Sequence, residues 1–343
     1  MTDTATPPRY SRLKDRYQIV SLIGRGGLAS VYLARDEFLG RDVAVKLFDA
    51  SVGDPASLAR QEQELRVLAR LNHHSLVSLL DAGVSTASDP QRAQMFLVME
   101  LVRGSTLKAR MVSGELSRRE IGLIGTDLAE GLEYIHQNGI VHRDVKPANI
   151  LMVAYTVDDP RPRAKLADFG IALLAHADRV TMEGATTGTA AYLSPEQALG
   201  DPLGAPSDIY SLGLVLLECF TGRIAFPGAP VPSAVARLLR DPEISADVPE
   251  DWRQLLSAMT AREAADRPVV RDVILTLQQI TITEMARHSA VDESLLPPSE
   301  ASRMFAVERY GTRHPRRWRV RPHNGPRRST FQCPHRHCEH RRP

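Results

Sequence analysis

A glycine-rich stretch near the amino terminus has the composition of a phosphate-binding turn. It consists of Gly24, Arg25, Gly26, Gly27, Leu28, Ala29, Ser30 and Val31. Glycines leave backbone N–H groups uncovered, so phosphate oxygens can approach them closely. A predicted strand follows this turn, whereas a helix would follow in a dinucleotide-binding fold or a P-loop, so both of those folds are excluded. For this motif alone, a glycine-rich hairpin without a ligand is the alternative.

A lysine ends the next apolar strand. In the Val-Ala-Val-Lys sequence at 43–46, strand alternation puts Ala44 and Lys46 on one face. A small residue beside a cation suits an adenine ring over Ala44 whose phosphates reach Lys46. Lysine is scarce, at five residues against 38 Arg, so its position here is informative. In a predicted helix at 57–71, Glu64 is placed to pair with Lys46 and hold it for phosphate contact. A solvated lysine and a surface glutamate are the alternatives.

Two motifs farther along the chain complete a pattern. Residues 141–151 are Val-His-Arg-Asp-Val-Lys-Pro-Ala-Asn-Ile-Leu, and residues 165–170 are Lys-Leu-Ala-Asp-Phe-Gly. Together with the glycine-rich turn and the lysine strand, in this order, they resemble the protein-kinase signature. The resemblance covers about residues 17–280 and is strongest to bacterial eukaryotic-like (Hanks-type) Ser/Thr kinases of the PknB type. The lysine within the first of these motifs is typical of Ser/Thr kinases.

This resemblance implies a role for each matching residue. Asp144 would orient the attacking hydroxyl and accept its proton, and Lys146 would neutralise the transferred γ-phosphoryl group. Asn149 and Asp168 would hold Mg²⁺, because a hard cation prefers oxygen ligands. The residues expected at the nucleotide are Ile23, Gly24, Arg25, Gly26, Gly27, Leu28, Ala29, Ser30, Val31, Ala44, Lys46, Glu64, Met99, Glu100 and Val102.

The resemblance also implies an activation segment between Asp168 and Glu196. Arg143, beside the catalytic aspartate, is typical of kinases in which a phosphate in this segment neutralises the arginine. The phosphosite candidates are Thr181, Thr186 and Thr187. Of these, Thr181 best matches the phosphorylated threonine of PknB-type kinases, which carry a second threonine where this chain has Glu183.

Four further residues are expected to be structural. Thr189 matches the threonine that bridges the catalytic aspartate and lysine. Glu196 should form a buried ion pair with Arg267, for which the loss of either partner is costly. Asp208 should brace the backbone of the catalytic loop.

Hydrophobic periodicity predicts an α+β fold with two lobes. Short β-type runs predict a five-stranded antiparallel sheet, at 17–24, 30–36, 42–49, 75–83 and 95–101. Helical spacing at 57–71 adds one helix to this sheet, and it dominates later at 117–138, 194–199, 207–222, 232–240, 251–260 and 269–280. A β-rich lobe thus precedes a helical one, and the resemblance implies a bilobal protein-kinase-like fold. Its smaller N-lobe covers 17–99, the hinge 100–102, and its larger, mainly helical C-lobe 103–280.

The formal charge of +2 is the sum of an acidic segment and a basic segment of the chain. Residues 281–343 carry thirteen Arg, no Lys and six acidic residues, a net of +7, which leaves −5 for residues 1–280. This tail is rich in Arg, His and Pro without periodicity, and it is predicted to be disordered, whereas the polar residues 1–16 predict a flexible arm. Two Cys and three His between Cys333 and His340 form one cluster without a second, which disfavours a zinc site. An alternative interpretation is that selection does not maintain the amino-acid sequence of this tail.

The expected activity is that of a Mg-ATP-dependent Ser/Thr protein kinase that autophosphorylates its activation segment. Mn²⁺ is a substitute metal, and the expected partners are protein substrates and a second copy of the kinase for autophosphorylation in trans. Three cysteines, with no secretory signal and no transmembrane run, predict a cytoplasmic protein, either a soluble or a truncated kinase. One alternative is a pseudokinase or nucleotide-binding interaction module, which the intact catalytic set disfavours. Another is a kinase tethered to nucleic acid or an anionic surface by its tail, which the lack of interleaved aromatic residues disfavours.

Overall fold

A computed structural model of the chain describes residues 12–26, 29–51, 69–85, 94–153, 162–168 and 190–294. The chain divides into two units, Met1–His288 and Ser289–Pro343. The first contains both lobes described below. Of the second, the structure describes only the residues that end the last helix. No helix in the described ranges is long and apolar enough to cross a bilayer.

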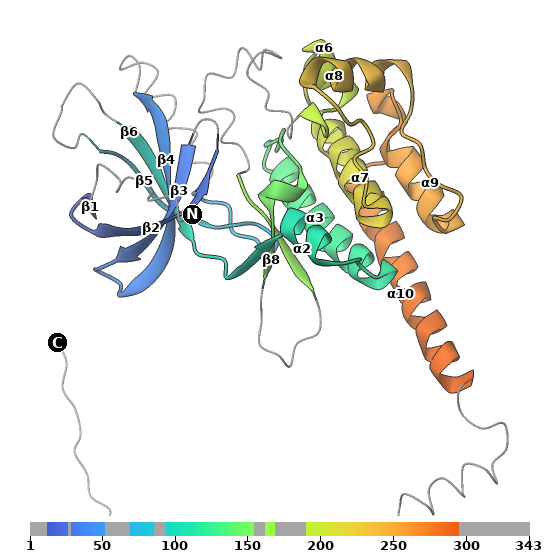
Figure 1. Cartoon of the computed structure of the whole chain (residues 1–343), viewed down its shortest axis with the longest axis horizontal. Helices are drawn as coiled ribbons and strands as arrows, with labels where there is room; N and C mark the ends of the chain where they lie inside the picture. Colours follow the sequence, from blue (N-terminus) through green and yellow to red (C-terminus); the bar gives the residue numbers. More distant parts are fainter. Residues whose placement is uncertain are drawn as a thin grey trace, which may run out of the picture. The chain divides into compact units, whose positions relative to one another are not determined.

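Six antiparallel strands form the sheet of the N-lobe (Figure 1). Val, Ile, Leu and aromatic residues, which favour strands, are frequent along its longer strands, and β6 is a continuous run of buried residues at 95–99. The strand order is β1-β2-β3-β4-β6-β5. The strands span Arg12–Leu13 (β1), Tyr17–Arg25 (β2), Ala29–Asp36 (β3), Arg41–Ser51 (β4), Leu79–Ser85 (β5) and Gln94–Glu100 (β6). The five expected strands are confirmed, although β5 begins later than expected.

The first strand corrects the prediction of a flexible arm for residues 12–16, the part of residues 1–16 that the structure describes. Leu13 pairs with Tyr17 and is fully buried, and the Arg16 guanidinium donates two hydrogen bonds of 2.8 Å to the buried Asp36 carboxylate. These hydrogen bonds from Arg16 outweigh burial and lower the pKa of Asp36 to about 2. Residues 12–16 are therefore part of the folded lobe. The prediction failed because a two-residue strand has no periodicity of its own.

The predicted helix at 57–71 lies mostly outside the described residues. Within it, the structure describes only residues 69–71, and residues 69 and 70 form a turn. Glu64 is among the residues that are not described.

A second, small sheet lies where the C-lobe begins, and the sequence did not predict it. Its order is β7-β8-β9, with strands Gly104–Thr106 (β7), Ile150–Val153 (β8) and Arg163–Leu166 (β9). Helix α2, at Leu107–Ser113, follows β7 directly and begins at the N-cap Thr106, whose hydroxyl accepts a hydrogen bond from the Ala109 amide. These elements are too short to show a clear period, and β8 and β9 are stabilised by pairing with each other.

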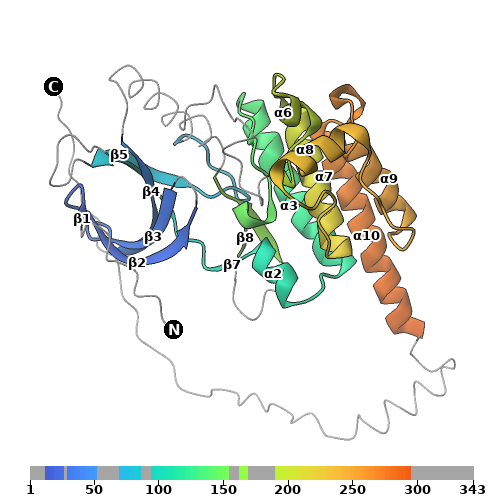
Figure 2. The ribbon, with the colours of Figure 1, turned by 45° about the horizontal axis from the view of Figure 1, so that its top comes forward.

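Helices build the rest of the C-lobe (Figure 2). They span Arg118–Gln137 (α3), Pro195–Leu199 (α6), Ala205–Thr221 (α7), Pro230–Leu239 (α8), Glu250–Met259 (α9) and Val270–Ser294 (α10). Two single 3-10 turns, η1 (Pro147–Asn149) and η2 (Ala264–Asp266), interrupt the connecting segments. The helix starts agree with the predicted ones within two residues. Helix α3 packs against α7 and β9, and α7 packs against α9.

The longest helices are positioned by caps and by burial. Helix α3 begins with a capping box, in which Ser117 and Glu120 satisfy each other's backbone N–H groups. Helix α7 is apolar on nearly every side and forms the centre of the C-lobe core. Helix α10 continues to Ser294, so the predicted boundary at 280 falls inside a helix and the prediction of disorder from 281 is wrong for residues 281–294.

Candidate active site

The predicted catalytic loop connects α3 to strand β8, and its side chains meet at one carboxylate. Asp144 Oδ2 lies 2.8 Å from Lys146 Nζ and accepts a hydrogen bond of 2.9 Å from Asn149 Nδ2. Asn149 also donates to the Asp144 backbone carbonyl, at 2.9 Å, because the 3-10 turn η1 folds the chain back at this point. The three residues predicted from the sequence are therefore in direct contact. Since the Asn149 amide nitrogen faces Asp144, its carbonyl oxygen is the atom left for another ligand.

A buried aspartate on α7 holds the backbone of this loop. The Asp208 carboxylate accepts hydrogen bonds of 2.8 Å from the backbone N–H groups of His142 and Arg143, and it lies 2.7 Å from His136 Nε2. Arg143 adopts a left-handed backbone conformation, with φ of 69°, which is costly for a residue other than glycine. The two hydrogen bonds to Asp208 stabilise that conformation. Asp208 therefore makes the hydrogen bonds to the backbone of the catalytic loop that its expected bracing role requires.

Lys46 extends from the N-lobe sheet to the end of β9. Its Nζ lies 2.9 Å from Asp168 Oδ1, and its side chain is 11% exposed. Asp168 follows β9 in a left-handed conformation with φ of 65°. We expected Glu64 as the partner of Lys46. Glu64 lies outside the described residues, and the partner of Lys46 that the structure describes is Asp168.

An apolar cluster lies between the two lobes beside Lys46. Ala44, Val77 and Met99 form its buried part, and the partly buried residues packed on it are Val31, Leu79, Leu101, Val102, Leu151 and Ala167. It joins strands β3, β4 and β6 of the N-lobe to β8 and the end of β9. The sequence predicted Val31, Ala44, Met99 and Val102, but it missed the other five: Val77, Leu79, Leu101, Leu151 and Ala167. Leu151 ends the motif at 141–151, two residues after Asn149, and this closeness in sequence was the signal that could have identified it.

The glycine-rich turn joins β2 to β3. The Gly26 amide donates a hydrogen bond of 2.8 Å to the Ala29 carbonyl, which closes a tight hairpin. Ala29 and Ser30 are buried, whereas Ile23 is 53% exposed. Gly27 and Leu28, at the tip, lie outside the described residues.

The hinge residue Glu100 has contacts that the sequence did not reveal. Its amide donates to the Ser78 carbonyl at 3.0 Å, so this N–H is not available to adenine. Its carboxylate lies 2.7 Å from Lys165 Nζ and accepts from the Ser78 amide at 2.9 Å. Lys165 Nζ also donates to the Leu76 carbonyl at 3.2 Å. This network ties the hinge to β9 in the other lobe.

The activation-segment threonines, Thr181, Thr186, Thr187 and Thr189, lie outside the described residues. The chain is described again from Ala190, where it leads into α6. Gln197 on α6 donates a hydrogen bond of 2.7 Å to the Arg143 carbonyl. The end of the activation segment is therefore attached to the catalytic loop.

Glu196 and Arg267 form the expected ion pair. Arg267 donates two hydrogen bonds, of 2.7 and 2.9 Å, to the two Glu196 oxygens, and its side chain is fully buried. Ser207 Oγ donates a third, at 2.6 Å. Burial by itself opposes ionisation of Glu196, but the hydrogen bonds from Arg267 and Ser207 outweigh it and lower the pKa to about 2. The remaining Arg267 donors bond to the carbonyls of Pro206, Ala261 and Arg262.

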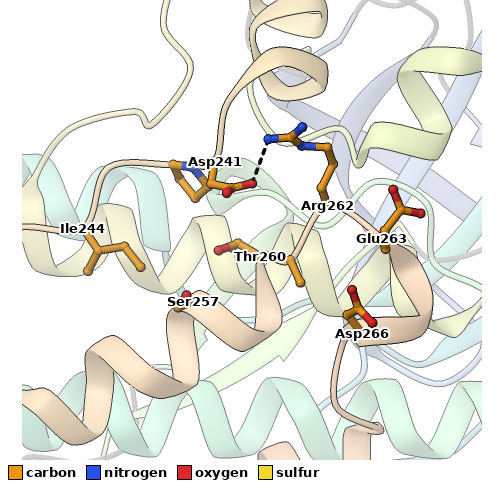
Figure 3. A pocket seen from close by; sticks show the side chains of 9 residues that line it. Asp241, Ile244, Ser257, Thr260, Arg262, Glu263 and Asp266 are labelled. Carbon is orange, nitrogen blue, oxygen red and sulfur yellow. Dashed lines mark hydrogen bonds and ion pairs between the residues drawn. The ribbon is translucent and has the colours of Figure 1, made fainter.

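A pocket of about 390 Å³ lies elsewhere in the C-lobe, between the end of α8 and the end of α9 (Figure 3). Its charged lining consists of Asp241, Glu263 and Asp266 with Arg262, which pairs with Asp241 at 3.4 Å. None of the predicted site residues lines it. Because its lining is mainly acidic, this pocket would repel the phosphates of a nucleoside triphosphate.

Comparison with known proteins agrees with the geometry. The family described as Protein kinase domain matches residues 17–277. Serine/threonine-protein kinase PknB of Mycobacterium leprae (strain TN) is 41% identical over 268 residues, which cover 77% of this chain and 41% of that protein. The PknB of Mycobacterium tuberculosis (strain H37Rv) is 40% identical over 263 residues, covering 75% and 41%. That of Mycolicibacterium smegmatis is 39% identical over 268 residues, covering 77% and 41%.

The aligned part is thus about two fifths of the length of these curated relatives. The match of the family extends over most of the chain, and it includes the catalytic loop, the lysine strand and the glycine-rich turn. The chain therefore belongs to the protein kinase family, and it is similar to the bacterial Hanks-type kinases of the PknB kind.

Proposed function

We propose that the chain is a Mg-ATP-dependent serine/threonine protein kinase. The observation that carries the proposal is two sets of side-chain contacts among five residues, one within the catalytic loop and one that joins the two lobes. Asp144, Lys146 and Asn149 are in mutual contact, and Lys46 in the N-lobe sheet contacts Asp168. The small number of cysteines and the need for ATP support a cytoplasmic location for the domain.

The nucleotide lies between the lobes in this proposal. The apolar cluster around Ala44, Met99 and Leu151 presents side chains from both lobes, as the two faces of a planar adenine ring require. Lys46, next to this cluster on β4, binds the phosphates. The glycine-rich turn between β2 and β3 is the element expected to lie over the phosphates.

The donors near the phosphates fit a hard divalent cation. The carbonyl oxygen of Asn149 and the carboxylate of Asp168 are oxygen ligands, which Mg²⁺ prefers over nitrogen or sulfur, and Mn²⁺ accepts the same set. Bound with ATP, the metal ion neutralises charge on the phosphate oxygens. The contact of Asp168 with Lys46 keeps its carboxylate beside the phosphate-binding cation.

Transfer follows from the positions of Asp144 and Lys146. Asp144 orients the Ser or Thr hydroxyl of the substrate and accepts its proton. The hydroxyl oxygen then forms the new bond to the γ-phosphorus, while the bond to the leaving oxygen of ADP breaks. Lys146, at 2.8 Å from Asp144, neutralises the oxygens of the group in transit.

A direct assay tests the proposal. Purified protein is incubated with ATP labelled at the γ-phosphate, with and without Mg²⁺, and label on Thr or Ser is measured. Label that depends on the metal supports a kinase. Nucleotide binding without any transfer would instead support the pseudokinase alternative.

The first prediction concerns Lys46. Lys46→Met should lower kcat/KM by about 10²-fold or more, because it removes the cation that binds the phosphates and holds Asp168. Lys108→Met is the matched control, since Lys108 is an exposed lysine on α2 outside the site. Steady-state kinetics with ATP as the varied substrate measure the effect. Equal losses in the two variants would contradict the role of Lys46.

The second prediction concerns the activation segment. Thr181→Ala should slow phosphorylation of a generic protein substrate about tenfold or more, because the segment loses the phosphate that pairs with Arg143. Thr283→Ala, on the exposed side of α10, is the control. If one copy of the kinase phosphorylates another, the initial rate of autophosphorylation should rise with the square of the protein concentration. Full activity of Thr181→Ala would assign the switch to Glu183 or to Thr186 and Thr187.

A further inference from the structure

Three side chains of metal-ligating types converge at helix α3, outside the candidate active site. They are His74, from the segment that leads into β5, and Asp127 and Glu130 on α3. One ligand atom of each lies within 4.8 Å of the other two, and His74 Nε2 is 3.2 Å from Glu130 Oε2. In the part of the chain that the structure describes, no other three His, Cys, Asp or Glu side chains converge in this way.

The spacing of residues on α3 places the two carboxylates together. Asp127 and Glu130 are three residues apart, so their side chains leave the helix on the same face, one turn apart. Asp127 is 1% exposed, and its Oδ2 accepts a hydrogen bond of 3.1 Å from the Ala164 amide. Carboxylates that bind metal ions are commonly oriented by such a hydrogen bond from a neighbouring group. Asp127 is therefore held in position without an ion.

The segment that carries His74 is attached to the same helix by other contacts. The ring of the preceding residue, His73, stacks on the Tyr134 ring of α3, with the ring centroids 5.2 Å apart. A glycine at position 131 of α3 permits the close approach of this segment, because a Cβ atom on Gly131 would lie only 3.3 Å from the Ser75 carbonyl oxygen. His74 thus extends from a backbone that is already positioned against α3.

The chemistry of the three donors indicates the kind of ion. An imidazole nitrogen and carboxylate oxygens are common ligands of Zn²⁺, whereas Mg²⁺ and Ca²⁺ prefer oxygen ligands alone. Two carboxylates this close repel each other, and a divalent cation between them removes the repulsion. Three protein ligands leave the fourth position of a tetrahedral Zn²⁺ ion to water. The His74 side chain is 51% exposed, so an ion can enter from solvent.

We propose that His74, Asp127 and Glu130 form a structural Zn²⁺ site. The ion links the segment before β5, a strand of the N-lobe, to helix α3 of the C-lobe. The same segment is hydrogen-bonded to β9, since the Leu166 amide donates to the Ser75 carbonyl at 2.8 Å. Zn²⁺ therefore stabilises a junction of three elements. None of the proposed catalytic or nucleotide-binding residues is a ligand, so the site does not depend on the proposed kinase function.

The test has to exclude binding of Zn²⁺ elsewhere in the chain. Cys333 and Cys338 lie close in sequence to three His, and Asn149 and Asp168 are the proposed ligands of Mg²⁺. The background protein is therefore the full chain with Cys333→Ser and Cys338→Ser. Excess Mg²⁺ and ADP are added to occupy the nucleotide site. Competition with a coloured chelator then gives the stoichiometry and the dissociation constant of Zn²⁺.

Helix α3 offers a matched pair of glutamates for this measurement. Glu133 lies three residues after Glu130 and is also partly buried, but it pairs with Arg271 at 3.6 Å and is not one of the three ligands. The background protein should bind one Zn²⁺ ion. Glu130→Gln and His74→Gln should each weaken this binding about 100-fold or more, since the loss of even an outer hydrogen bond to a ligand costs about 10–100-fold. Glu133→Gln should bind Zn²⁺ as the background protein does.

Two further measurements report on the geometry and on the structural role. Co²⁺ in place of Zn²⁺ should give the visible absorption of a four-coordinate ion in the background protein but not in Glu130→Gln. Zn²⁺ at about 100 times its dissociation constant should raise the melting temperature by about 5 °C or more, and His74→Gln should abolish this rise. If one of these variants does not fold, the other gives the result. A background protein that binds no Zn²⁺, or equal binding by Glu130→Gln and Glu133→Gln, would overturn the proposal.

Discussion

Asp144→Asn should reduce phosphate incorporation by about 10²–10⁴-fold, the usual contribution of a positioned general base. The Asp144 carboxylate lies 2.8 Å from Lys146 Nζ and accepts a hydrogen bond of 2.9 Å from Asn149. An amide of the same shape keeps the side chain in place but cannot accept the proton of the substrate hydroxyl. The measurement is the initial rate of labelling with ATP labelled at the γ-phosphate.

Two controls show whether Asp144→Asn loses activity because the proton acceptor is gone or because the protein no longer folds. The melting temperature and the affinity for a nonhydrolysable ATP analogue should both remain close to those of the parent, since the Asp208 brace and the apolar cluster are untouched. Glu115→Gln, a change of the same kind elsewhere in the C-lobe, should transfer phosphate at the parent rate. Equal labelling of the parent and Asp144→Asn would show that another group accepts the proton.

The largest effect on stability is expected at the pair of Glu196 and Arg267. Arg267→Met should lower the free energy of unfolding by about 3 kcal/mol, because it leaves a buried carboxylate without its cation. This figure is at the lower end for a buried pair, since the Glu196 side chain is 13% exposed. For a domain of this size, the loss corresponds to a fall of about 6–12 °C in the melting temperature. Arg262→Met is the control, because its pair with Asp241 at 3.4 Å is exposed and should contribute at most about 1 kcal/mol.

The same pair predicts how stability depends on pH. In the folded chain the pKa of Glu196 is about 2, below its ordinary value of 4.5. The contribution of a group with a lowered pKa is complete above its unfolded pKa and is lost as the pH falls toward its folded pKa. The difference in stability between the parent and Arg267→Met should therefore be largest above about pH 5 and shrink between about pH 4.5 and pH 2. A difference that stays constant over this range in denaturant unfolding would contradict the assignment.

The sequence predicted the long elements because each carries its own signal. Helix α3 has an apolar face with a 3.6-residue period and a capping box at Ser117. The longer strands of the first sheet are runs rich in Val, Ile, Leu and aromatic residues, and β2 and β3 are joined by the glycine-rich turn. The short elements were missed for the opposite reason. Strands β1, β8 and β9 have only two to four residues each and are stabilised by pairing with a neighbouring strand, so they are too short to show a period of their own.

The candidate active site also contains some contacts that the sequence predicted and others that only the fold revealed. The motif at 141–151 identified Asp144, Lys146 and Asn149 as one set, and their closeness in sequence made their contact predictable. The partner that the structure gives Lys46, Asp168, is more than a hundred residues away, and the sequence had suggested Glu64 instead. The cluster beneath the proposed adenine site also needed the fold, because Val77, Leu151 and Ala167 come from three segments that only the contact between the lobes brings together.

By itself, the sequence determined the family, the order of the long elements and which residues are proposed as reacting groups, because these depend on residue types at fixed local spacing. Tertiary structure alone decided which distant side chains hold those groups in place. Asp208 reaches back to the catalytic loop from α7, and Arg237 reaches the segment after Thr189 from α8. Each uses directional hydrogen bonds to backbone atoms, and backbone atoms carry no signal in the sequence.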